Sequence, residues 1–234
     1  ANCLVVGVSG GIDSSVVSTL CARTGIKTLV ASMPISQRPE HHDLSIKHKN
    51  WLTSKYQNAY GVEIDLTGAY LSFENILTDK KFTSDLGLAN SKARLRMMTL
   101  YQISASTSGL VVGTGNKVED FGVGFYTKYG DGGVDISPIA DCNKSQVWAM
   151  GKELGILEEI QMAEPTDGLW SDGRTDTDQL GMSYKEIEHL MSRPDEVGYD
   201  KYLAIRKKNL HKMKPIPVCK FDGKDTLDTD QKET

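Results

Sequence analysis

The sequence predicts a doubly wound α/β fold, in which helices flank a parallel sheet and further helices are added at the C-terminal end. Two observations support this class. Short β-branched runs alternate with longer amphipathic stretches, as in a parallel sheet covered by helices. A glycine-rich turn also joins the first of these runs to a helical stretch, where open α/β sheets bind ligands. We expect a single domain over residues 1–221 and, because residues 222–234 are charged and lack aromatic side chains, a disordered tail there.

The first half of the chain reads as three strands and two helices. Residues 4–8 are rich in valine, which is typical of a buried strand. Apolar residues at helical spacing predict a helix over residues 14–24, and Gly25 ends it. The remaining elements expected here are a strand over 27–33, a long polar helix over 40–60 and a strand over 62–66.

The second half begins with a helix expected over residues 91–104. Four of its residues fall near one face: Leu95, Met98, Tyr101 and Gln102. A fourth strand is predicted over 110–114, and a helix over 145–154 has Asn143 as its cap and Gly155 as its stop. The polar segment 164–181 is typical of a long mobile loop. The last helices are expected over 184–191 and 202–213.

Composition excludes several classes of function. The 27 basic and 31 acidic residues give a net charge of −4. The chain therefore has no excess of positive charge with which to bind nucleic acid or an anionic membrane. No apolar run reaches the ~18 residues of a membrane helix, and the N-terminus does not resemble a signal peptide. The four cysteines show no C-x-x-C spacing, so neither a zinc site nor a redox pair is indicated. We therefore expect a cytoplasmic protein.

The turn after the first strand reads Val8-Ser9-Gly10-Gly11-Ile12-Asp13-Ser14-Ser15. Its two glycines let backbone amides approach a phosphate, and the following helix adds the positive end of its dipole. A carboxylate beside phosphates repels them unless a cation lies between, so Asp13 indicates Mg²⁺. The alternative is a plain glycine turn with Asp13 or Ser14 as a helix cap. Ser-Gly-Gly-x-Asp-Ser directly after a strand favours the phosphate site, although it is not the loop of kinases and GTPases.

This turn resembles the pyrophosphate loop of the N-type ATP pyrophosphatases, whose fold is of the adenine nucleotide alpha hydrolase type. Further motifs follow in an order that resembles the ammonia-dependent NAD synthetases. These motifs are residues 90–97, 112–119, 125–135, 143–146, 164–166, 176–184 and 211–212. The block Thr-Lys-Tyr-Gly-Asp-Gly-Gly at residues 127–133 is the most specific of them.

The resemblance implies an amidation of deamido-NAD (nicotinic acid adenine dinucleotide) to NAD. Ammonia is the nitrogen donor, and ATP, as co-substrate, is cleaved to AMP and pyrophosphate through an adenylated carboxylate. It also implies Mg²⁺ and a homodimer whose substrate site draws residues from both subunits. Once these motifs are placed, too little chain remains for a glutaminase centre, so we expect free ammonia to be used directly.

The resemblance further implies a role for each matching residue. ATP contacts would come from Gly7, Val8, Ser9, Gly10, Gly11, Ile12, Asp13, Ser14, Thr114, Lys144 and Thr166. Contacts to deamido-NAD would come from Arg94, Lys128, Asp135, His211 and Lys212. Asp13 and Glu119 would bind Mg²⁺, and together with Lys144 they would be the catalytic residues. Taken singly, most have a simpler explanation, such as a surface ion pair for Arg94.

Three features depart from the family pattern. Gly115 stands where an acidic residue often follows Gly-Thr, and the stretch 119–128 is one residue longer than usual. The family's His-Lys-Arg triplet reads His-Lys-Met, ending at Met213. These departures affect the surroundings of the expected Mg²⁺ ligand and remove one positive charge.

Two other functions stay open on the sequence alone. The first is another pyrophosphate-loop ligase, either GMP synthetase-like or tRNA-modifying; the acidic net charge and scattered cysteines disfavour the tRNA enzyme. The second is a regulator that binds ATP without turnover. Asp13 and Glu119 argue against it, because a passive binder has little need for two carboxylates around a triphosphate.

Overall fold

The fold is built on a four-stranded parallel sheet, seen in a computed structural model that describes residues 1–36, 39–170 and 172–219. The strand order is β3-β2-β1-β4. The strands are β1 (Cys3–Gly7), β2 (Thr28–Ser32), β3 (Ala59–Glu63) and β4 (Gly109–Val112). All four match strands expected from the sequence, with β3 displaced by three residues. The tail predicted to be disordered, 222–234, lies outside the described residues.

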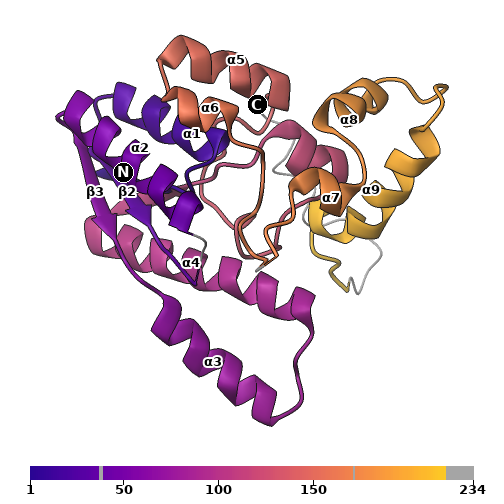
Figure 1. The fold of residues 1–234 in the computed structure, drawn as a ribbon, viewed down its shortest axis with the longest axis horizontal. Helices are drawn as coiled ribbons and strands as arrows, with labels where there is room; N and C mark the ends of the chain where they lie inside the picture. The colour runs from indigo at the N-terminus through magenta and orange to yellow at the C-terminus, as the bar shows by residue number, and fades with distance from the viewer. Residues whose placement is uncertain (37–38, 171, 220–234) are drawn as a thin grey trace.

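Helices cover both faces of the sheet, which confirms the doubly wound class (Figure 1). One face carries α1 (Ile12–Arg23), α2 (Pro39–Lys55), α5 (Lys144–Leu154) and α6 (Glu158–Met162). The opposite face is covered by α4 (Asp85–Thr107), with α3 (Thr67–Asp79) beside it. Alternation along β1 serves both layers: Leu4 and Val6 join the apolar core under α1, whereas Val5 joins the core over α4.

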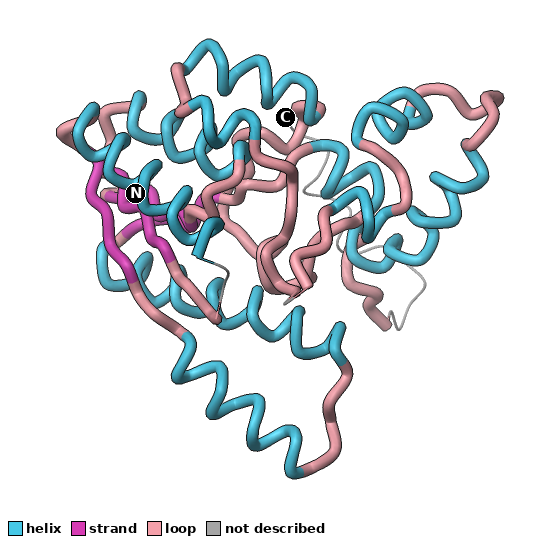
Figure 2. The backbone as a smooth tube through the Cα atoms, in the orientation of Figure 1, coloured by secondary structure: helices cyan, strands magenta, loops and turns pink. Residues whose placement is uncertain are grey.

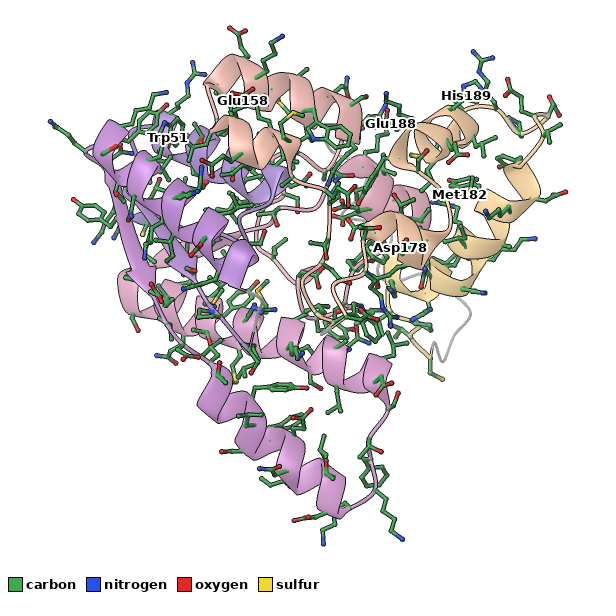
Figure 3. The ribbon with its side chains drawn as sticks, viewed as in Figure 1. Trp51, Glu158, Asp178, Met182, Glu188 and His189 are labelled. Atoms are coloured by element: carbon green, nitrogen blue, oxygen red, sulfur yellow. The ribbon has the colours of Figure 1, made fainter. Side chains whose placement is uncertain are left out.

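A third group of elements lies beside the sheet. It consists of the π-helix η1 (Val118–Val123) and the helices α7 (Asp176–Leu180), α8 (Tyr184–Met191) and α9 (Tyr199–Met213). They share a separate apolar cluster that includes Met182. Glu188 of α8 accepts hydrogen bonds from the N–H and hydroxyl of Ser145 at the start of α5, at 2.8 and 2.7 Å (Figure 3). Figure 2 shows the loops gathered between this group and the sheet layers.

The helix expected over 40–60 was too long, because α2 ends at Lys55. Asn58 lies in the turn that follows, and its side-chain amide donates to the carbonyls of Ala22 and Ile26, both at 2.8 Å. These bonds fasten the turn against α1, so that β3 begins at Ala59. Helix α3, the short helices α6 and α7, and η1 were not expected from the sequence.

The four residues expected near one face of the helix over 91–104 do not form its buried face. Met98 and Tyr101 are exposed, at 64% and 39%. The buried residues of α4 include Ala93, Met97 and Leu100, of which Met97 and Leu100 belong to the apolar core with β1 and β4. None of the helices in the described part of the chain is long and apolar enough to span a membrane.

Candidate active site

A cavity of about 710 Å³ opens at the carboxyl ends of β1 and β4. The residues predicted to contact ATP line this one cavity together with Glu119. They are Gly7, Val8, Ser9, Gly10, Gly11, Ile12, Asp13, Ser14, Thr114, Lys144 and Thr166. The structure thus brings residues separated by more than 150 positions into one site, as the strand ends of a parallel sheet allow.

The turn between β1 and α1 is held in shape by hydrogen bonds to the hydroxyl groups of Ser9 and Ser14. The N–H of Gly11 donates to Ser9 Oγ at 3.2 Å, and the N–H of Ser9 donates to Ser14 Oγ at 3.2 Å. Gly10 has φ +88°, a conformation in which other residues are strained. No side-chain hydrogen bond caps α1. Its first N–H groups therefore remain suited to an anion.

An ionic cluster lies beside this turn. Lys144 Nζ is 2.5 Å from Asp13 Oδ2 and 2.9 Å from Glu119 Oε1, and the Lys144 side chain is almost fully buried. Burial raises the pKa of Asp13 despite the opposing charge of Lys144. Burial also acts to raise the pKa of Glu119, but Lys144 and a bond from Tyr184 outweigh it, so that this pKa is lowered. The two carboxylates outweigh burial at Lys144 and raise its pKa, so the lysine is charged.

Two polar side chains that the sequence did not assign hold this cluster in place. Asn116 is fully buried, and its amide donates to Asp13 Oδ1 at 3.0 Å. Its carbonyl oxygen accepts from the N–H of Val118 and of Glu119 at 3.0 and 3.1 Å. Asn116 therefore links the Asp13 carboxylate to the backbone of Glu119. The sequence feature that could have identified Asn116 is its position in the Gly-Thr-Gly-Asn turn after β4.

The second is Tyr184, whose hydroxyl lies 2.6 Å from Glu119 Oε1 and 2.7 Å from Asp176 Oδ2. A phenol has one hydrogen to donate, so two carboxylate partners require a further proton. Burial raises the pKa of Asp176 to about 7, which lets this carboxyl keep that proton near neutral pH. Tyr184 can then donate to Glu119 while it accepts from Asp176.

The donor set fits the cation predicted from the sequence. Asp13 and Glu119 present carboxylate oxygens, the ligands that Mg²⁺ prefers, and Lys144 already holds a positive charge between them. Within residues 1–36, 39–170 and 172–219 no group of three or more His, Cys, Asp or Glu side chains could hold a metal. Phosphate oxygens and water would therefore have to complete the coordination of Mg²⁺.

The loop after α6 forms another wall of the cavity. Thr166 Oγ1 donates to the carbonyl of Arg174 at 3.1 Å. Trp170 is anchored by a 2.9 Å bond from its indole N–H to Gln179 and by the guanidinium of Arg174, 4.2 Å from the centre of its ring. Lys92 Nζ donates to the carbonyl of Leu169 at 2.9 Å. These contacts tie the loop to α7 and α4.

The residues predicted to contact deamido-NAD divide into two groups. His211 and Lys212 line the main cavity. Arg94, Lys128 and Asp135 do not line it. Arg94 Nε and Nη2 are each 3.3 Å from the carbonyl of Lys128, and Arg94 borders a second, more open pocket of about 460 Å³.

Asp135 is held by β4 and α4. Its Oδ2 accepts from the N–H of Val111 at 2.8 Å, and its Oδ1 accepts from the hydroxyl of Tyr101 at 3.1 Å. This carboxylate therefore joins the loop after residue 127 to the sheet. Of this second group, Arg94 borders the open pocket, whereas Lys128 and Asp135 line neither of the two pockets.

The structure shows what lies next to Gly115, one of the departures from the family pattern. A Cβ atom at Gly115 would lie 2.3 Å from Asp120 Oδ2, so the Asp120 carboxylate already fills that space. The stretch that was expected to be one residue longer begins within the π-helix η1. An acidic group thus lies next to position 115, although it belongs to residue 120.

Comparisons with known proteins agree with this geometry. A family model described as NAD synthase matches residues 1–220. An NH3-dependent NAD(+) synthetase from Carboxydothermus hydrogenoformans is 39% identical over 82% of this chain and 77% of its own. The solved structure of an NMN synthetase from Francisella tularensis has a TM-score of 0.85 at 32% identity, covering 94% of this chain and 90% of its own. An NH3-dependent NAD synthetase from Campylobacter jejuni, solved with nitrate, has a TM-score of 0.72 at 26% identity with the same coverages.

Proposed function

The chain belongs to the NAD synthase family, and on that premise we propose that it amidates deamido-NAD to NAD with ammonia while cleaving ATP to AMP and pyrophosphate. One observation carries the proposal. The pyrophosphate-type turn, Asp13, Glu119 and Lys144 all face one cavity at the sheet edge. A turn that binds phosphate and two carboxylates that accept a cation are what phosphoryl chemistry at ATP requires.

In the first half-reaction the carboxylate of the substrate attacks the α-phosphorus of ATP. The bond from this phosphorus to the oxygen bridging to the β-phosphate breaks, and pyrophosphate leaves with that oxygen. The N–H groups of the turn and of the first turn of α1 bind the phosphates. Lys144 is charged and lies beside Asp13, where it can balance the departing pyrophosphate. Asp13 and Glu119 would hold Mg²⁺, which neutralises phosphate charge when bound.

In the second half-reaction ammonia attacks the acyl carbon of the adenylate. The new C–N bond forms as the bond to AMP breaks, and the nitrogen loses a proton. The wall formed by residues 163–170 keeps bulk water from the acyl adenylate, which would otherwise hydrolyse.

The substrate would extend from the main cavity toward the open pocket. His211 and Lys212 would bind deamido-NAD from the same subunit as the phosphate turn, because they line the same cavity. Arg94, Lys128 and Asp135 would serve the substrate at a homodimer interface. The open pocket that Arg94 borders includes the exposed side chains of Met98 and Tyr129, at 64% and 60%, which a second subunit could cover.

A second candidate substrate is nicotinate mononucleotide, whose amidation gives NMN by the same chemistry. It is favoured by the higher TM-score to the NMN synthetase, 0.85, against 0.72 for the NAD synthetase, at equal coverage. Only the portion of the substrate beyond the first phosphate differs between the two reactions. The phosphate turn and the carboxylates would therefore act identically in both.

The experiment that tests these proposals supplies ATP, MgCl₂ and ammonium chloride with either deamido-NAD or nicotinate mononucleotide, and measures the amide product by mass spectrometry. We expect a higher kcat/KM for deamido-NAD. A higher value for the mononucleotide would favour the second candidate, and no amide from either would refute both. Equal rates with ammonia-free glutamine in place of ammonium would contradict the use of free ammonia.

We also propose a reducing, cytoplasmic setting. Cys3 and Cys21 are buried and free, Cys142 is half-buried and free, and Cys219 is exposed and free. Thiols that stay unpaired are typical of reducing compartments.

A further inference from the structure

The segment that carries Glu119 ends at a glycine in the left-handed conformation. Residues 118–128, here called the Glu119 segment, consist of η1 and the turn after it. Gly124 follows η1 with φ +66°, and the N–H of Phe125 returns to the carbonyl of Glu119 at 2.9 Å. A helix end leaves its last carbonyl groups without intrahelical donors. The position of this segment therefore depends on donors from elsewhere.

Those donors come from α9. Arg206 Nη1 donates to the carbonyl of Gly122 at 2.9 Å, and Asn209 Nδ2 donates to that of Val123 at 2.8 Å. Lys212 Nζ then reaches two carbonyls, those of Gly124 and Tyr126, at 2.8 and 2.7 Å. The three donor residues are spaced three apart and so share one face of α9. A bond in the opposite direction joins Lys128 Nζ to the carbonyl of His211 at 2.9 Å.

Packing supports the same contact independently. A Cβ atom at Gly124 would lie 2.6 Å from Asn209 Cβ and 2.7 Å from Met213 Cε. Met213, which departs from the family's usual arginine, therefore lies against the end of the Glu119 segment. Val118 and Val123 of η1 are fully buried in the same apolar cluster as Tyr202 of α9.

We propose that α9 is a positioning element for Glu119, in which Arg206, Asn209 and Lys212 fix the backbone that presents this carboxylate to the cation. The inference rests on the proposed role of Glu119 as a Mg²⁺ ligand. It differs from direct substrate binding by α9, because Arg206 does not line the cavity. His211 and Lys212 do line it, so one helix serves the substrate end of the cavity and the placement of Glu119.

Arg206 gives the sharpest test, with Lys207 as the matched control. Lys207 is the neighbouring cation on α9 and is exposed. We expect Arg206→Ala to raise the Mg²⁺ concentration for half-maximal pyrophosphate release about tenfold, as loss of an outer-shell partner typically does. Lys207→Ala should leave it unchanged, and Arg206→Lys should restore most of the loss.

A second readout needs no turnover. With α,β-methylene ATP present, added MgCl₂ should raise the melting temperature, and Arg206→Ala should shift that titration to about tenfold higher Mg²⁺. If Arg206→Ala lowers the melting temperature but leaves the Mg²⁺ titration and the Mg²⁺ dependence of turnover unchanged, the role is merely structural and the inference is overturned.

A double-mutant cycle with Glu119→Gln separates the inference from the proposed function. If Arg206 acts through Glu119, Arg206→Ala should slow pyrophosphate release little further once Glu119 is replaced. Suppose that Glu119→Gln alone is strongly impaired and that Arg206→Ala slows pyrophosphate release by the same factor in this variant as in the original chain. That result would overturn the inference and leave the proposed function intact. Normal turnover by Glu119→Gln alone would overturn both.

Discussion

The two walls of the cavity are built in different ways. The phosphate wall is one continuous stretch, β1, its glycine turn and α1, and it presents mainly backbone N–H groups. The opposite wall is assembled around Glu119 from η1, α8 and α9, which are far apart in sequence and joined by side-chain hydrogen bonds. The phosphate wall is held by hydrogen bonds among neighbouring residues of one turn, whereas the Glu119 wall depends on side chains from separate elements. A single substitution in η1, α8 or α9 should therefore be enough to displace Glu119.

The largest effect is expected where the two walls meet. Asp13→Asn keeps the shape of the side chain but removes the negative charge that faces Lys144 and the expected cation. We expect a folded protein with pyrophosphate release reduced about a hundredfold or more. Asp141→Asn is a suitable control, because that carboxylate is exposed and pairs with Lys117 outside the cavity. Near-normal turnover by Asp13→Asn would contradict the role of the two carboxylates.

Next in size is the loss of the Tyr184 hydroxyl from the Glu119 wall. Tyr184→Phe removes the donor to Glu119 Oε1 and separates Asp176 from its partner. We expect about a tenfold lower kcat together with a higher Mg²⁺ requirement. Tyr199→Phe serves as the control, since Tyr199 lies on α9 and packs against Tyr202. If kcat and the Mg²⁺ requirement of Tyr184→Phe match those of the control, Tyr184 does not position Glu119.

A smaller effect, on stability, is expected at Gly115. An alanine Cβ there would lie 2.3 Å from Asp120 Oδ2, so the carboxylate must move. We expect Gly115→Ala to lower the free energy of unfolding by about 1–3 kcal/mol, measured by urea denaturation. Adding Asp120→Ala should recover much of this loss. Additive losses in the double variant would show that the two positions do not compete for space.

The smallest effect concerns the pH dependence of stability. Desolvation by neighbouring atoms raises the pKa of the Asp131 carboxyl to about 6 from its ordinary value of 3.8, although the residue as a whole is exposed. Because the folded-state pKa is raised, the stabilisation is complete below pH 4 and is lost as the pH rises through 6. Because solvent screens an exposed residue, this carboxyl should lower the free energy of unfolding by only about 0.5 kcal/mol between pH 5 and pH 7. Asp131→Asn should reduce the change in the free energy of unfolding between pH 5 and pH 7 by that amount. An unchanged pH dependence in this variant would show that another group is responsible.

The same contrast explains what the sequence could predict. The phosphate wall was predicted nearly in full, because its strand, turn and helix are consecutive and each has a local signal. The grouping of Asp13, Glu119 and Lys144 followed from the resemblance, and the cavity contains all three. The roles of these residues remain predictions that the experiments above test.

The Glu119 wall was predicted much less well, for a physical reason. Nothing local in residues 118–123 indicates a π-helix, because the donors to its last carbonyls belong to α9, more than 80 positions later. Tyr184 was noted in a motif but received no role, since its two carboxylate partners come from separate elements. Similarly, the helical spacing of Met98 and Tyr101 does not identify the buried face of α4, because both side chains are exposed.

The central claim is that both walls act on one ATP molecule and direct its cleavage between the α- and β-phosphates. The most direct test is the product stoichiometry with ATP, MgCl₂, ammonium chloride and the preferred nicotinate substrate. The account predicts AMP, pyrophosphate and amide in equal amounts, all lost together in Asp13→Asn. Formation of ADP and orthophosphate, or of amide without matching AMP, would contradict it.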